Sequence, residues 1–286
     1  MKNKKLVGIL FVLGAAFSFT FMNLFVSLSG DVPTLQKVFF RNCVACILAF
    51  AMIINQPSAL KTIKGNEKTL FFRSFFGLMG VVLNFYALSS INITDASLLN
   101  KLSPFFAMIF SIFILKEKFK KFEWGIVILA FIGAIFVIKP TFSVKVIPYF
   151  AGFLSGLFAG LAYTLVRKAT KNGAAGAVIV FAFSSFSSIV ILPFVIFNFA
   201  PMTTLQWVYL ILAGVSAAGG QFCITFAYKF APAKEISVFD YTQVLFAAIV
   251  GFLVLNQIPD LYSFIGYFII ITAAVIRWQY NLKKRD

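Results

Sequence analysis

Ten stretches of mostly apolar residues follow one another along the chain, separated by short polar breaks. Each is close to the roughly 20 residues with which an α-helix crosses a bilayer, and together they leave little chain for a soluble domain. The pattern predicts an all-α polytopic membrane protein. To within a few residues its transmembrane helices are expected at 6–28, 35–54, 69–90, 94–115, 122–138, 148–166, 175–197, 205–228, 234–255 and 261–280. The first stretch is longer than the roughly 7–15 apolar residues of a signal peptide, so we expect it to remain as a helix.

Composition narrows the function. Of the 286 residues, 61% are hydrophobic and 12% charged, whereas soluble domains carry about 45–50% and about 25%. A soluble enzyme and a nucleic-acid-binding protein are excluded on this ground, despite a net charge of +16. No histidine is present, which removes the commonest metal ligand and the usual base near neutral pH. Cys43 and Cys46 match C-x-x-C, but no further ligands accompany them, so we interpret them as small apolar fillers and expect neither metal nor cofactor.

The basic residues predict the topology. With the N-terminus placed in the cytoplasm, 19 of the 25 Lys and Arg residues fall in cytoplasmic segments and two, Lys139 and Lys145, in external ones. Cytoplasmic loops are enriched in Lys and Arg. We therefore expect both termini in the cytoplasm and ten spans between them, in the cytoplasmic membrane of a bacterium.

A shift of 140 residues aligns the chain with itself. Identities are sparse, but the register holds without a gap over 36 positions, pairing Gly80 with Gly220, Ala87 with Ala227, Ser97 with Ser237, Phe106–Ala107 with Phe246–Ala247 and Leu115 with Leu255, and the acids Asp95 and Glu235 with each other. The shift carries the third span onto the eighth, an odd offset that reverses direction across the membrane. The alignment predicts two inverted five-helix repeats, 1–140 and 141–286. Such repeats are a recurrent design of secondary transporters, with the substrate site at the repeat interface.

Charged residues inside the spans are functional candidates, because charge in a membrane is costly. Lys37 and Arg73 lie near span ends, where they are expected to snorkel to the interface. Asp95 and Glu235 begin spans four and nine, where carboxylates suit helix capping; a proton site is the alternative. Arg41 lies too deep to snorkel and is expected to contact substrate, a gate or a structural ion pair.

Lys101 and Asp240 are the most informative of these residues. Each lies about two turns into its span, and the two spans are repeat partners: Lys101 aligns with Tyr241, and Asn100 with Asp240. One hypothesis is a zwitterion site, in which Lys101 binds a carboxylate and Asp240 an ammonium group. The alternative is a salt bridge between them, or to Arg41, that closes a gate. Asp240 is also the candidate for proton coupling.

Polar and glycine residues complete the candidate cavity. Lining candidates are Asn23, Asn84, Tyr86, Asn100, Tyr163, Gln221, Tyr241 and Gln243, with hydrogen bonding between helices as the structural alternative. Packing and hinge candidates are Gly152, Gly156 and Gly160, which form a double GxxxG on the sixth span, and Pro104, expected in the middle of the fourth helix and able to bend it.

These motifs resemble the EamA-type branch of the drug/metabolite transporter superfamily over essentially the whole chain. The residues that carry the resemblance are Phe39–Arg41, Asn84–Leu88, Thr94–Leu99, Pro104, Leu115–Glu117, Gly125, Gly133 and Lys139–Pro140, and in the second half Ala227–Tyr228, Ala231, Ile236–Ser237 and Gly266. Gln257 departs from the acid that is common in its place. The resemblance implies ten helices in two repeats, a central cavity and alternating access, in a family that moves amino acids, nucleotide sugars, choline-like cations and other metabolites.

We therefore predict a secondary transporter of a small polar metabolite, an amino acid or related zwitterion, acting as a monomer or homodimer. Alternatives are a carrier of an organic cation or a nucleotide-type metabolite, and a lipid flippase or scramblase. A membrane enzyme is not expected, because no nucleophile–base motif is present.

Overall fold

The computed structural model describes residues 2–116, 120–138, 146–230 and 237–283. These residues form helices, with no strand among them. Their bounds are α1 Lys2–Leu28, α2 Thr34–Ile54, the 3₁₀ helix η1 Pro57–Ile63, α3 Glu67–Leu88, α4 Ile93–Asn100, α5 Ser103–Leu115, α6 Lys121–Ile138, α7 Ile147–Lys171, α8 Gly176–Phe197, α9 Thr204–Phe230, the 3₁₀ helix η3 Ser237–Tyr241, α11 Thr242–Leu255 and α12 Leu261–Lys283.

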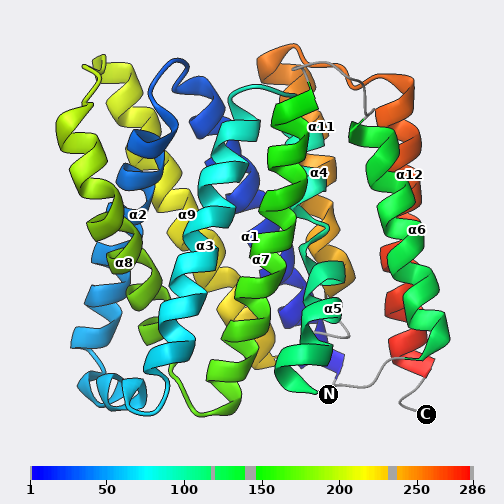
Figure 1. Ribbon diagram of the computed structural model, residues 1–286, viewed down its shortest axis with the longest axis horizontal. Helices are drawn as coiled ribbons and strands as arrows, with labels where there is room; N and C mark the ends of the chain where they lie inside the picture. Colours follow the sequence, from blue (N-terminus) through cyan, green and yellow to red (C-terminus); the bar gives the residue numbers. More distant parts are fainter. Residues whose placement is uncertain (1, 117–119, 139–145, 231–236, 284–286) are drawn as a thin grey trace.

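Ten helical segments within the described residues are long and apolar enough to cross a membrane, which confirms the predicted spans. The helices stand side by side, and α1 begins on the face where α12 ends (Figure 1). We call this side the terminal face. The main difference from the predicted segments is the fourth span, which consists of two helices, α4 and α5.

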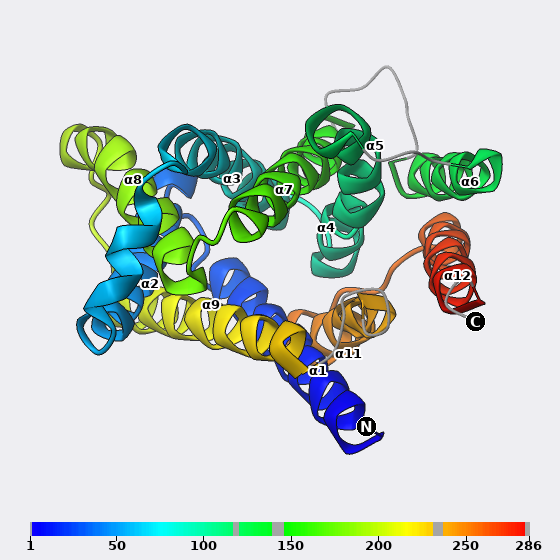
Figure 2. The same ribbon diagram turned by 90° about the horizontal axis from the view of Figure 1, so that it is seen from below.

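The helices pack in a pairwise pattern that fits the predicted repeat. The most extensive contacts are α1 with α9, α3 with α7, α6 with α12 and α2 with α8. Under the predicted repeat, α1 corresponds to α7 and α9 to α3, so the first two contacts are equivalent. The pairs α2–α8 and α6–α12 are each made of one helix and its own counterpart, and they lie at opposite ends of the long axis (Figure 2).

Backbone details recur at the same spacing of 140 residues. Lys116 and Asn256 are the only non-glycine residues of the described chain with positive φ, at 54° and 52°. Each ends its helix in the left-handed conformation and donates its N–H to a carbonyl five residues earlier, that of Ser111 or Gly251. Such a residue is a common helix terminator. The two halves thus end α5 and α11 in the same way.

Lys37 is placed differently from the prediction. It is 1% exposed rather than snorkelling. Its ammonium donates to the carbonyl oxygens of Val26 (3.2 Å) and Gly30 (2.8 Å) and to Ser89 Oγ (3.0 Å). An ammonium group has three donors, so the burial of this charge is compensated by three hydrogen bonds.

Candidate functional site

Two spans are irregular at equivalent positions, one through a gap between two helices and the other through a change from 3₁₀ to α-helix, and we call each position a break. Helix α4 ends at Asn100 and α5 begins at Ser103; 140 residues later, η3 ends at Tyr241 and α11 begins at Thr242. In the first break, Pro104 cannot donate to the carbonyl four residues earlier, that of Asn100. The fourth span is therefore not the continuous helix that was expected: it is interrupted just before Pro104, which lies in the first turn of α5, where a missing N–H is tolerated.

The two breaks face each other. Lys101 Nζ lies 2.6 Å from Asp240 Oδ2, and their side chains are 10% and 22% exposed. The Tyr241 hydroxyl donates to the Lys101 carbonyl oxygen at 2.9 Å, and Asn100 Nδ2 donates to Ser155 Oγ on α7 at 3.1 Å. We call Lys101, Asp240 and Tyr241 the junction. It brings a cation of one half and an anion of the other into a direct ion pair, which is the salt-bridge alternative raised by the sequence.

A second set of charged residues acts on Tyr163, which belongs to α7. Arg41 on α2 and Arg73 on α3 both act electrostatically on this tyrosine, as does Asp240. Tyr163 is 51% exposed. It is thus a tyrosine on which the aspartate of the junction and the two arginines all act.

Arg73 was missed as a site residue. It is 6% exposed, and its guanidinium carbon lies 4.1 Å from the ring centroid of Phe183 on α8, so the prediction that it snorkels is wrong. The glycine one turn further along α3, Gly77, was a sequence signal for this placement. A Cβ at Gly77 would lie 3.2 Å from Arg73 Nη1 and 3.0 Å from the Phe183 ring. The glycine leaves room for the guanidinium to fold back along α3.

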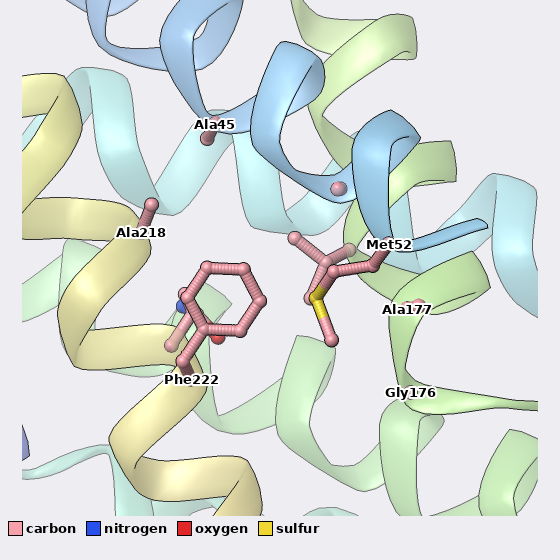
Figure 3. Close-up of a pocket in the computed structure, with 9 residues that line it drawn as sticks. Ala45, Met52, Gly176, Ala177, Ala218 and Phe222 are labelled. Atoms are coloured by element: carbon pink, nitrogen blue, oxygen red, sulfur yellow. The ribbon is translucent and has the colours of Figure 1, made fainter. Parts of the chain in front are cut away.

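A small pocket of about 30 Å³ lies between α2, α8 and α9 (Figure 3). It contains one of the predicted lining residues, Gln221. The other lining residues are apolar or glycine: Ala45, Ala49, Met52, Gly176, Ala177, Val180, Ala218 and Phe222. Ala45 lies one turn beyond Arg41, and Val180 one turn before Phe183, so the pocket extends along the helix faces that carry these two residues.

The other predicted lining residues lie elsewhere. Tyr86 is in the last turn of α3 and is exposed, and the buried Asn84 Oδ1 has no hydrogen-bond partner among the described residues. Asn23 Nδ2 donates to Ser97 Oγ at 3.1 Å. The backbone oxygen of Gln243 accepts from Thr20 Oγ1 at 3.3 Å. These contacts join helices inside the bundle.

The glycines of α7 pack against the broken span. A Cβ on Gly156 would lie 2.5 Å from the Leu99 carbonyl oxygen, and one on Gly160 would lie 2.6 Å from Phe106 Cβ; Gly152 faces Leu99 in the same way. Small residues allow such close approach of helices. The double GxxxG therefore supports α4 and α5 on both sides of the break. Whether these glycines act as hinges stays a prediction.

The start of α4 is stabilised from the other half of the chain. Asp95 lies in the first turn, as expected, and its Oδ1 accepts a 2.6 Å hydrogen bond from Tyr267 on α12. The backbone N–H of Ile93, in the first turn of α4, donates a 2.9 Å hydrogen bond to Gln257 Oε1. The residue that departs from the family pattern thus caps the helix that leads to the junction. Glu235 lies outside the described residues.

Ten apolar helical segments among the described residues, two of which meet inside the bundle through an ion pair, are the architecture of a polytopic membrane protein and fit the class of transporters. The sequence profile of the EamA-like transporter family matches residues 6–139 and again 146–278. The chain belongs to this family, so it is a transporter rather than an enzyme.

Several characterised transporters are similar over most of their length. The chain is 29% identical to the pseudopaline exporter CntI of Pseudomonas aeruginosa over 271 residues, 94% of each protein. It is 25% identical to the riboflavin transporter of Vibrio cholerae, over 99% of this chain and 97% of that one. Human solute carrier family 35 member G1 is also 25% identical, over 97% and 81%. A solved crystal structure, 14% identical, has the same fold, with a TM-score of 0.68 over 96% of this chain and 97% of its own.

Proposed function

We propose that this protein carries a small zwitterionic metabolite, an amino acid or a derivative of one, by alternating access between its two halves. The single observation that carries the proposal is the Lys101–Asp240 ion pair, which joins the equivalent breaks of the two halves. Because removing one partner from a buried ion pair leaves an uncompensated charge, opening the junction requires replacement charges. A zwitterion supplies both, its carboxylate for Lys101 and its ammonium for Asp240.

In this mechanism the ion pair and the bound substrate are alternatives. The pair closes the path when the site is empty, and the substrate separates it while keeping both charges compensated. Tyr241, which donates to the Lys101 carbonyl, orients the lysine. Asn100 would contribute a neutral polar contact, and Arg41 and Tyr163 would contact the remainder of the substrate. We assign the terminal face to the cytoplasm of a bacterium on the basis of the asymmetry in Lys and Arg.

Uptake of radiolabelled amino acids into proteoliposomes tests the proposal, with choline and nucleotides as competing substrate classes. Saturable transport of a zwitterion that is lost in both Lys101→Ala and Asp240→Ala is the expected result. Transport of cations that needs only Asp240 would contradict it and favour the organic-cation alternative. Movement of a fluorescent lipid between leaflets would indicate a flippase or scramblase. Repeating the assay with and without an imposed proton gradient tests Asp240 as the coupling residue.

A further inference from the structure

Two buried arginines lie near the same phenylalanine ring, and no ion pair among the described residues includes either of them. Arg41 is 4% exposed and Arg73 is 6% exposed. Arg41 Nη1 donates to Asn42 Oδ1 at 2.7 Å. Three other nitrogen atoms of the two arginines are buried and have no hydrogen-bond partner among the described residues. They are Arg41 Nε, Arg73 Nε and Arg73 Nη1. We call Arg41 and Arg73 the arginine pair.

The neighbours of the arginine pair do not neutralise it. Both guanidinium carbons lie near the Phe183 ring, at 5.7 Å from its centroid for Arg41 and 4.1 Å for Arg73. An aromatic face attracts a cation, but the free energy gained is far smaller than the hydration free energy that a guanidinium group loses on burial. The two positive charges also act on each other. Two positive charges buried near the Phe183 ring require a negative charge to compensate them.

No described carboxylate supplies this counter-charge. Asp240 acts electrostatically on Tyr163, but its Oδ2 forms the ion pair with Lys101. None of the ion pairs among the described residues includes either arginine. The N–H groups of the two guanidinium groups that have no partner are therefore suited to binding an anion that comes from outside the protein.

The small pocket between α2, α8 and α9 lies next to the arginine pair along two helices. Its lining includes Ala45, one turn from Arg41, and Val180, one turn from Phe183. Tyr163, on which both arginines act electrostatically, is 51% exposed.

We propose that Arg41 and Arg73 bind an oxyanion, a carboxylate or phosphate group, with the N–H groups that have no partner beside the Phe183 ring. Guanidinium forks match both groups by paired N–H···O bonds. The further step, that the transported metabolite carries this group, rests on the proposed function. The metabolite then has an anionic group in addition to the charges that meet the junction.

Thermal unfolding of the protein in neutral detergent tests the site, with succinate or inorganic phosphate replacing chloride at constant ionic strength. We expect both to raise the Tm by several degrees and to saturate, since an anion that binds only the folded state stabilises it. Arg73→Gln should abolish this shift. It should also raise the Tm in chloride alone, because it relieves the repulsion, whereas an arginine with a structural role would lower it.

The matched control is Lys68→Gln, which removes one exposed positive charge from the same helix. It should leave the anion-dependent shift unchanged. Arg41→Lys keeps the charge but lacks the fork, and should weaken anion binding at least tenfold; it serves as the second variant if Arg73→Gln does not fold. Absence of any stabilisation by the two anions, or its persistence in Arg73→Gln, would overturn the site.

A third arm adds phosphatidylglycerol to the detergent and identifies the source of the anion. Stabilisation by this lipid alone would assign the oxyanion to a headgroup and overturn its assignment to the metabolite. Zwitterion uptake is measured separately. Uptake without anion binding contradicts only the arginine site, and anion binding without uptake contradicts only the proposed function.

Discussion

The junction and the arginine pair both bring charge into the interior of the bundle, but only the junction compensates it. At the junction, Lys101 of one half meets Asp240 of the other, and two helix breaks coincide. Arg41 and Arg73, both of the other charged region, lie near the Phe183 ring and have N–H groups without a hydrogen-bond partner among the described residues. Under the two proposals this difference separates two tasks: the balanced site is closed without a ligand and opens when a zwitterion replaces both partners, whereas the unbalanced one is complete only when an anion is bound.

The largest expected effect tests the balance of the junction. Lys101→Ala should reduce transport at least about 100-fold and the stability by about 3 kcal/mol, because Asp240 loses its partner. Lys101→Ala/Asp240→Ala should recover most of the stability but none of the transport. Proteoliposome uptake and denaturant unfolding measure the two effects. Wild-type uptake by Lys101→Ala would show that the junction is not part of the substrate path.

The second prediction concerns the support of the junction by α7. A Cβ on Gly160 would lie 2.7 Å from the Ser103 carbonyl oxygen and would push the helices apart. Gly160→Ala should therefore destabilise the protein by about 1–3 kcal/mol. The control is Gly125→Ala on α6, where nothing lies within 4 Å of the added Cβ, and where alanine should stabilise by about 0.5–1 kcal/mol. Equal effects of the two substitutions in unfolding experiments would contradict the close packing.

The third prediction tests whether the two regions share one ligand. Tyr163→Phe keeps the ring and removes the hydroxyl, and should raise the KM for the transported metabolite about 5- to 10-fold, the equivalent of one hydrogen bond of about 1–1.5 kcal/mol. Its kcat and the Tm should stay close to those of the wild type, because the tyrosine is half exposed. Tyr262→Phe, an exposed tyrosine of α12, is the control. An unchanged KM would separate the arginine pair from the transport site.

The smallest expected effect concerns the cap of α4. Gln257→Ala leaves the Ile93 N–H without its 2.9 Å acceptor and should cost about 1 kcal/mol of stability, the usual value for a lost helix cap. Gln257→Glu keeps an acceptor and should restore the stability. If both variants unfold at the same denaturant concentration, the hydrogen bond contributes nothing.

The spans could be predicted because ten runs of apolar residues carry a strong signal. The break in the fourth span could not be located, since Leu98, Leu99 and Leu102 continue the apolar pattern through it. In this region only Pro104 indicated an irregular helix, and we interpreted it as the site of a bend rather than as the start of a second helix. Lys101 and Asp240 were found because charge inside a span is rare.

Arg73 was misjudged because the distance to a helix end does not tell which way a long side chain turns. That direction depends on Gly77 of its own helix and on Phe183 of another, more than a hundred residues away. Likewise, the sequence could not show that Lys37 finds acceptors on two other segments. A single sequence gives positions along helices, whereas these contacts depend on how the helices pack.

The hydrogen bonds of Lys37 also have a mechanical consequence. Its ammonium joins α2 to the end of α1 and to Ser89, which follows α3. Three helix ends on the side opposite the terminal face are thereby braced at one point. Under the proposed alternating access, we expect these ends to move together as one rigid block, and the bending between inward-open and outward-open forms to occur deeper in the bundle, where α4 and α5 separate.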